Sequence, residues 1–291
     1  MKLLEGKKAL ITGGGRGIGK AVAIEFAKNG ADIAIASRTD SELNQAQKEI
    51  ENYDVRCITI PIDLSSIDGV KDCVNRYFKI FEQCDILICN AGMTHFSTVI
   101  DYPLEKAEKL FNLNFISYYA FINLILPKMI EQGGGNIILT SSPQGTVYFS
   151  SHKVAYSSSK AAVMAMGKCL QLEVSRQNIR VNVISPGAIH TKMMEDLIEW
   201  GQNFPEKVPP KEIAPLYLFF ASEISKRKYK GQVINHLMLN EILRIIKENK
   251  GDNELEIKDI VSLMEDKLNK EYYSFLRKNQ ELVEFMLKYK I

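Results

Sequence analysis

Short apolar runs alternate with longer segments of helical period along the first 240 residues, and this alternation constrains the fold more than any other feature. The runs that we predict to be strands cover residues 8–12, 32–37, 57–63, 85–90, 135–142, 179–186 and 231–235. The predicted helices lie near residues 17–29, 40–52, 66–82, 103–131, 156–177 and 211–224. This order indicates a parallel sheet covered on both faces, and right-handed crossovers then give a doubly wound α/β fold of about seven strands.

The charge and cysteine content argue against several classes of protein. A net charge of +2 provides no field for binding nucleic acid or an anionic membrane. The five cysteines are an odd number without C-x-x-C spacing, which is typical of buried thiols in a reducing cytosol. No run reaches the about 18 apolar residues of a membrane-spanning helix, and the apolar stretch before the first glycines is too short for a signal peptide. No two histidines stand at i, i+4, the spacing of a metal site on a helix. We therefore expect a cytoplasmic protein without a metal site and without nucleic-acid or membrane partners.

Ligands of a doubly wound fold bind beyond the carboxyl ends of the strands, so residues that follow strands are the first candidates. The first strand runs into Thr12-Gly-Gly-Gly-Arg-Gly-Ile-Gly19 and then into a helix. Glycines let the backbone approach a pyrophosphate, and the helix N-terminus offers it free N–H groups. The spacing departs from G-x-G-x-x-G, but its position still predicts a dinucleotide-binding turn. The contacts that we assign to it are Gly13, Gly15, Arg16, Gly17, Ile18 and Gly19.

The end of the second strand indicates which dinucleotide binds. It reads Ser37-Arg38-Thr39, with no carboxylate for an adenosine ribose hydroxyl before Asp40. A serine accepts a 2′-phosphate without repulsion, a guanidinium can chelate it, and Arg16 could approach the same phosphate. We therefore predict NADP(H) over NAD(H). The alternative is that both arginines are ordinary exposed charges.

The third strand ends at Asp63, which is followed by Leu64, and we include both residues in the cofactor site. The Asp63 carboxylate is a candidate acceptor for the adenine amino group. An equally simple role for Asp63 is that of a helix N-cap.

Tyr156 and Lys160 stand four residues apart in the stretch VAYSSSK. On a helix they are neighbours on one face. A nearby cation favours the phenolate and lowers the pKa of a tyrosine, so that Tyr156 could exchange a proton with a substrate. The same spacing also occurs by chance on surface helices, so the pair alone does not define a site.

Together these motifs resemble those of the short-chain dehydrogenase/reductase family, over about residues 5–240. The motifs that carry the resemblance are Thr12-Gly-x-x-x-Gly-x-Gly19, Asn90-Ala-Gly92, Asn114, Ser142, Tyr156-x-x-x-Lys160 and Pro186-Gly187, in the family's order and spacing. The resemblance implies a Rossmann fold that binds NADP(H) and reversibly reduces a ketone to a secondary alcohol. It also implies a homodimer or homotetramer.

The resemblance implies a catalytic role for four residues. Tyr156 would donate the proton to the carbonyl oxygen, and Lys160 would lower its pKa and bind the nicotinamide ribose. Ser142 would hold the same oxygen, with Ser141 as the alternative. Asn114 would hold a water that links Lys160 to solvent, in competition with Asn112 or with a purely structural bond to the backbone. The remaining cofactor contacts that it implies are Asn90, Ala91 and Gly92 near the adenosine and Pro186, Gly187, Ile189 and Thr191 near the nicotinamide.

The substrate is narrowed only to a class. The candidate pocket walls, which include Thr94, His95, Phe96, Tyr148 and His152, are mixed apolar and aromatic. This favours a 3-oxoacyl thioester, a steroid or another bulky ketone as the small-molecule substrate. The alternative is a non-catalytic NADPH-binding sensor or scaffold that uses its C-terminal helices to bind a partner, and the intact set of four catalytic residues argues against it.

The chain departs from the family in two places. The segment 188–212, which would cover the substrate, is short, and the stretch GQVINHLMLNEIL lacks the usual Asp-Gly-Gly ending. We predict an oxidoreductase domain over residues 1–240 that holds both sites, followed by an extension over 241–291. Apolar residues recur at helical spacing in this extension, so we expect helices that pack on the core, form an oligomer interface, cover the site or dock another protein.

Overall fold

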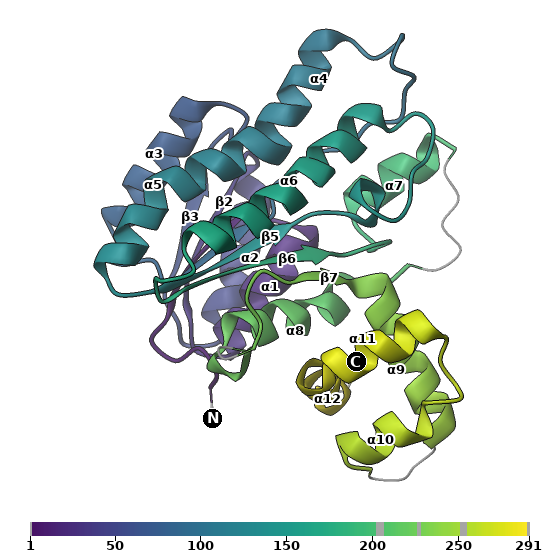
Figure 1. The fold of residues 1–291 in the computed structure, drawn as a ribbon. Helices are drawn as coiled ribbons and strands as arrows, with labels where there is room; N and C mark the ends of the chain where they lie inside the picture. The colour runs from purple at the N-terminus through teal and green to yellow at the C-terminus, as the bar shows by residue number, and fades with distance from the viewer. Residues whose placement is uncertain (1, 202–206, 226–227, 251–254, 290–291) are drawn as a thin grey trace. The chain divides into compact units, whose positions relative to one another are not determined.

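A seven-stranded sheet forms the centre of the computed structural model, which describes residues 2–201, 207–225, 228–250 and 255–289 (Figure 1). Its strands are β1 (Lys8–Thr12), β2 (Asp32–Ser37), β3 (Cys57–Pro61), β4 (Ile86–Cys89), β5 (Gly135–Thr140), β6 (Ile179–Ser185) and β7 (Val233–Asn235). They lie in the order β3-β2-β1-β4-β5-β6-β7, and the pairings from β3 to β6 are parallel. The order reverses direction beside β1, so the predicted doubly wound fold is confirmed.

Helices cover the sheet on both faces (Figure 1). On one face α3 (Ile67–Phe78) packs against α5 (Ser117–Glu131), and α6 (Val154–Glu173) packs against α4 (Leu104–Phe111) and the sheet. On the other, α1 (Gly17–Lys28) packs against α2 (Asp40–Glu51) and α8 (Pro210–Ala221). Because both faces are covered, the central strands are buried without alternation, and all seven residues of β6 are buried.

The predicted helix over 103–131 is interrupted by a π-helical turn, Asn112–Ile116, between α4 and α5. This stretch, Leu104–Glu131, is the one helix among the described residues that is long and apolar enough to cross a membrane. Its buried side chains Tyr118, Phe121 and Ile125 belong to the hydrophobic core that β4, β5 and α3 share. This burial is that of a core helix in an α/β protein.

Part of the segment predicted to cover the substrate is helical, as α7 (Lys192–Glu199). The chain returns through a single parallel bridge between Ile189 and Val208, and residues 202–206 lie outside the described residues. Thr191 caps α7, since its side chain accepts a hydrogen bond from the Met194 N–H. The covering segment is therefore fixed at its start to the loop that follows β6.

The chain forms two compact units, Met1–Val233 and Ile234–Ile291, whereas the boundary predicted from the sequence was residue 240, which lies inside α9. The second unit holds α9 (His236–Lys250), α10 (Ile257–Leu263), α11 (Lys270–Lys278) and α12 (Gln280–Lys288). These helices contact one another, and their apolar positions, such as Ile242, Met264 and Leu276, are buried. The helical spacing in the sequence therefore marks helices with a buried stripe.

Candidate active site

The turn between β1 and α1 has a backbone shape that only glycines permit. Gly13 and Gly17 have φ angles of 67° and 56°, in the left-handed region that favours glycine. At Gly19 an added Cβ would stand 2.2 Å from the Gly13 carbonyl oxygen, so the first turn of α1 lies directly against the end of β1. The turn thus brings the N-terminus of a twelve-residue helix to the edge of the sheet, which is the geometry that binds a pyrophosphate.

The end of β4 is fastened to this turn. The Thr12 hydroxyl accepts hydrogen bonds from the backbone N–H groups of Asn90 and Ala91, at 2.9 and 3.0 Å. The Asn90 side chain donates to the Thr12 carbonyl at 3.1 Å. Gly92 follows, and a Cβ there would lie 3.2 Å from the Asn114 side-chain oxygen. The Asn90-Ala-Gly92 stretch therefore connects the glycine turn with the residues predicted to be catalytic.

At the end of β2, the Ser37 hydroxyl is buried and has no hydrogen-bond partner. A Cβ at Gly15 would stand 3.0 Å from it, so the hydroxyl faces the glycine turn. Arg38 and Thr39 are exposed beside it. The Arg16 guanidinium forms an exposed ion pair with Glu42 at 3.2 Å. Of the two arginines predicted to bind the phosphate, only Arg38 has no ion pair within the described residues.

Asp63 lies beyond β3 but does not cap a helix. Its carboxylate accepts from the Ser65 N–H at 2.9 Å, whereas the N-cap of α3 is Ser66. Partial burial opposes ionisation, but the pKa of Asp63 is lowered overall because Ser65 donates to it and because Lys109 and Arg38 lie nearby. The next side chain, Leu64, is buried in the core, so only its backbone can face a cofactor.

Tyr156 and Lys160 lie on α6, one turn apart, as the sequence predicts. Ser142, the N-cap of the 3₁₀ turn Pro143–Gly145 that follows β5, lies near the Tyr156 phenol, and its side chain acts to lower the pKa of that phenol. The neighbouring Ser141 hydroxyl is already engaged, since it donates to the Lys160 carbonyl at 2.7 Å. This geometry favours Ser142 over Ser141 as the partner of the phenol.

The pKa of Tyr156 is raised, which corrects the expectation that Lys160 lowers it. Burial disfavours the phenolate, and the hydrogen bond with Ser142 opposes burial only in part. The Lys160 ammonium, itself 4% exposed, donates to the Thr140 carbonyl at 2.9 Å, and burial lowers its pKa to about 8. Both groups are therefore protonated at neutral pH.

Asn114 is fully buried in the π-helical turn. Its side-chain oxygen accepts from the Met93 N–H at 2.8 Å, and its amide donates to the Met93 carbonyl and to the Ser159 hydroxyl. The side chain is thus bonded to the backbone, as one alternative foresaw, and it ties the loop after β4 to α6. The role of Asn114 in a proton path stays a prediction, and π-helical turns are common at functional sites.

The loop after β6 lies against the glycine turn. Gly187 has a φ angle of 91°, Ile189 is buried, and the Thr191 hydroxyl donates to the Ile189 carbonyl. A Cβ at Gly17 would stand 3.1 Å from the Thr191 methyl group. Thr191 is therefore close to the turn predicted to hold the pyrophosphate, and its hydroxyl is hydrogen-bonded to Ile189 in the same loop.

Lys153, which was not predicted from the sequence, stands three residues before Tyr156 and is 2% exposed. Its ammonium donates to the Thr94 hydroxyl at 3.1 Å and to the His95 carbonyl at 2.6 Å, and it lies 5.7 Å from the centre of the Tyr156 ring. The only sequence feature that could have indicated Lys153 is its i, i+3 spacing to Tyr156. Lysines are usually exposed, so this spacing alone does not indicate a buried lysine at the site.

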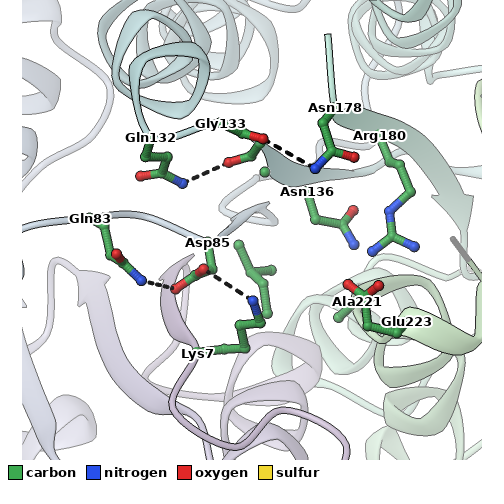
Figure 2. A pocket seen from close by; sticks show the side chains of 13 residues that line it. Lys7, Gln83, Asp85, Gln132, Gly133, Asn136, Asn178, Arg180, Ala221 and Glu223 are labelled. Atoms are coloured by element: carbon green, nitrogen blue, oxygen red, sulfur yellow. Dashed lines mark hydrogen bonds and ion pairs between the residues drawn. The ribbon is translucent and has the colours of Figure 1, made fainter.

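A pocket also opens at the opposite edge of the sheet, at the amino ends of the strands (Figure 2). Its polar side chains largely bond one another or the backbone: Gln83 and Lys7 donate to Asp85, and Asn178 donates to the Gly133 carbonyl. Buried Arg180 donates to the Ser222 carbonyl. None of the predicted site residues lines this pocket. The hydrogen bonds around it connect the amino ends of neighbouring strands.

Comparisons with known proteins agree with this geometry. The short chain dehydrogenase family profile matches residues 7–202. The 3-oxoacyl-(acyl-carrier-protein) reductase FabG of Thermotoga maritima is 32% identical over 79% of this chain and 96% of its own. The short-chain type dehydrogenase/reductase from Mycobacterium marinum superposes with a TM-score of 0.75 at 32% identity, over 80% of this chain and 94% of that one. L-sorbose reductase from Gluconobacter frateurii, complexed with NADPH and L-sorbose, gives a TM-score of 0.74 at 30% identity, over 81% and 97%.

Proposed function

Because the chain belongs to the short-chain dehydrogenase/reductase family, we propose that it is an NADP(H)-dependent oxidoreductase that reversibly reduces a ketone to a secondary alcohol. The observation that carries this proposal is that Tyr156 and buried Lys160 lie one turn apart on α6, with the Ser142 side chain near the Tyr156 phenol at the carboxyl edge of the sheet. Two neighbouring hydroxyls can both bond a single carbonyl oxygen.

The residues suit proton transfer in the reductive direction. With its pKa raised by burial, the Tyr156 phenol is protonated at neutral pH and can donate to the oxygen as negative charge develops there. Ser142 holds the same oxygen and stabilises that charge. The Lys160 ammonium, held at Thr140, stands one helical turn from Tyr156, and its role in this proposal is to stabilise the phenolate that forms during reduction.

The residues present fit a nicotinamide dinucleotide. The glycines of the β1–α1 turn leave backbone open where any Cβ would collide, and the buried Ser37 hydroxyl has a free hydrogen-bonding position next to them. Ser37 with exposed Arg38 would receive the 2′-phosphate of NADP(H), and the residues from Pro186 to Thr191 would face the nicotinamide. When bound, the cofactor supplies or accepts the hydride. The solved L-sorbose reductase is a complex with NADPH, which supports this assignment.

For the substrate, we propose a bulky carbonyl compound such as a 3-oxoacyl thioester, the substrate named for FabG, or a steroid. We further propose a cytoplasmic homodimer or homotetramer. The support for an oligomer is that large apolar side chains are exposed on α4, α5 and α6, namely Leu104, Tyr119 and Leu172. Light scattering on purified protein measures the oligomer size directly.

The substitution Tyr156→Phe tests the proposed chemistry, because it keeps the ring and removes only the hydroxyl. NADPH oxidation with a panel of ketones should slow by about a hundredfold or more, whereas NADPH binding, followed by fluorescence, should persist. Tyr53→Phe, at a partly exposed tyrosine in the segment after α2 and outside the predicted sites, is the matched control. Undiminished turnover in Tyr156→Phe would exclude the mechanism. Tight NADPH binding with no turnover of any ketone by the wild type would favour a non-catalytic sensor.

A further inference from the structure

The starting observation is a second buried ammonium next to Tyr156. Lys153 is 2% exposed, and its charge lies 5.7 Å from the ring centres of both Tyr156 and Phe96. Its hydrogen-bond partners, the Thr94 hydroxyl and the His95 carbonyl, are both neutral. Within the described part of the chain, no carboxylate forms an ion pair with it, and burial lowers its pKa to about 8. A buried cation without a counter-charge is rare, because its desolvation is not repaid.

The helix that carries Lys153 adds to the positive potential. Lys153 is the N-cap of α6, a helix of 20 residues, and no acidic residue stands in its first turn. A helix N-terminus carries a partial positive charge and favours anions, so a lysine is the wrong charge for this position. Natural helices usually place Ser, Thr, Asp or Asn here. This departure suggests that something other than the stability of the helix fixes the residue.

The neighbouring side chains do not cancel the charge. His95 is buried and stacks on Tyr102, and burial together with the charge of Lys153 lowers the pKa of His95 to about 4, so it is neutral. The Nδ1 atom of His95 is buried without a hydrogen-bond partner. The loop after β4 and the start of α6 are held together here, since the Ser97 N–H donates to the His152 carbonyl. The ammonium is therefore held by hydrogen bonds to Thr94 and His95, and the His95 side chain includes a buried polar atom without a partner.

We propose that Lys153 recognises a negatively charged group of the substrate, a carboxylate or a phosphate ester, close to the ketone that Tyr156 protonates. This inference rests on the proposed reduction, because it places the charge relative to the carbonyl held by Ser142 and Tyr156. It narrows the proposed carbonyl substrates to those that carry a carboxylate or a phosphate ester near the ketone. An anion bound at this point supplies the counter-charge that neither Lys153 nor the N-terminus of α6 finds in the described residues.

Matched pairs of ketones test the proposal, because the members of a pair share the same ketone and differ in whether an anionic group stands near it. The pairs are levulinate with methyl levulinate, acetoacetate with methyl acetoacetate, and dihydroxyacetone phosphate with dihydroxyacetone. For at least one pair, kcat/KM of the wild type should favour the anion by about tenfold or more, and the preferred pair identifies carboxylate or phosphate. The absence of an anion preference in all three pairs would overturn the proposal.

Substitutions then attribute the preference to Lys153. In Lys153→Met the ratio of anion to neutral ketone should fall about tenfold, whereas Lys153→Arg, which keeps the charge, should retain part of it. Lys168→Met, at an exposed lysine on the same helix, should leave the ratio unchanged. An unaltered ratio in Lys153→Met would show that Lys153 only fastens the loop after β4 to α6. NADPH affinity and the thermal midpoint establish that each variant is folded.

A binding experiment separates this inference from the proposed function. If no ketone is turned over, the proposed reduction fails, but separate calorimetric titrations of levulinate and of dihydroxyacetone phosphate into the NADPH-loaded protein still measure the binding of each kind of anion. Binding that is present in the wild type and lost in Lys153→Met supports an anion site without catalysis. Equal binding in both proteins, or none in either, overturns the inference.

Discussion

Replacing Lys160 by methionine should stabilise the fold and abolish turnover at the same time. The lysine is 4% exposed, and burial lowers its pKa from an ordinary value of 10.5 to about 8. Since a tenfold change in proton affinity corresponds to about 1.4 kcal/mol, holding the charged amine in the folded protein at pH 7 lowers the free energy of unfolding by about 3 kcal/mol. Methionine fills a similar volume without the charge.

The substitution also removes a hydrogen bond. The Lys160 ammonium donates to the Thr140 carbonyl at 2.9 Å, and the loss of such a bond costs about 1 kcal/mol. The carbonyl keeps one donor, because the Tyr118 hydroxyl lies 3.4 Å from it. The variant should therefore be more stable than the wild type by about 2 kcal/mol at pH 7, the difference between the two effects.

The pH dependence of the stability difference distinguishes removal of a buried charge from better packing as its cause. Between pH 8 and 10.5 the unfolded wild type holds a proton on Lys160 that the folded protein lacks, so the stability of the wild type rises with pH relative to the variant. The advantage of Lys160→Met should shrink across this interval and reverse near its end. Other titrating groups are common to both proteins and cancel in the difference.

Urea unfolding of both proteins at pH 7 and at pH 9.5 measures this difference. Lys168→Met, at an exposed position of the same helix, should differ from the wild type by about 0.5 kcal/mol or less at both pH values. A variant that is less stable at pH 7, or an advantage that does not change with pH, would refute the assignment of a buried charge to Lys160.

Two further substitutions probe the cofactor site. Gly19→Ala should lose NADPH binding and several kcal/mol of stability, because its Cβ would stand 2.2 Å from the Gly13 carbonyl oxygen. Calorimetry measures the loss of binding, and thermal unfolding measures the loss of stability. Normal NADPH binding by this variant would contradict the tight turn. Arg38→Ala should reduce the preference for NADPH over NADH by about tenfold or more, as measured by competitive titration, and an unchanged preference would remove Arg38 from the phosphate site. Arg16→Ala should have a smaller effect, because Arg16 is paired with Glu42.

Local patterns in the sequence predict most of the fold. The predicted strands over 8–12, 32–37 and 179–186 correspond to β1, β2 and β6, because a buried parallel strand is apolar along its whole length. The π-helical turn at Asn112–Ile116 was not predicted. No glycine or proline marks it, and it accompanies a bond between Asn114 and the backbone of Met93, 21 residues away in the chain.

In the candidate site, too, some features follow from local sequence patterns and others depend on the fold. Helical spacing brings Tyr156 and Lys160 together, but the rise in the pKa of Tyr156 and the fall in that of Lys160 come from burial, which depends on every element that packs over α6. Lys153 was missed for the same reason. Its spacing to Tyr156 is local, whereas its burial depends on Thr94 and His95, which belong to the loop after β4.

Tyr156 and Lys160 fall on one face of α6 because they are four residues apart, and Lys153 is the N-cap of the same helix, three residues before Tyr156. Both ammonium groups donate to backbone carbonyls, Lys153 at His95 and Lys160 at Thr140. A carbonyl positions an ammonium without neutralising it, whereas a carboxylate would cancel most of its field. With no acidic partner among the described residues, Lys160 can stabilise a phenolate for any ketone, and Lys153 can act only on a substrate that brings its own negative charge. Burying each ammonium lowers the stability of the fold, and the same burial preserves the electrostatic field that the ammonium exerts on the groups around Tyr156.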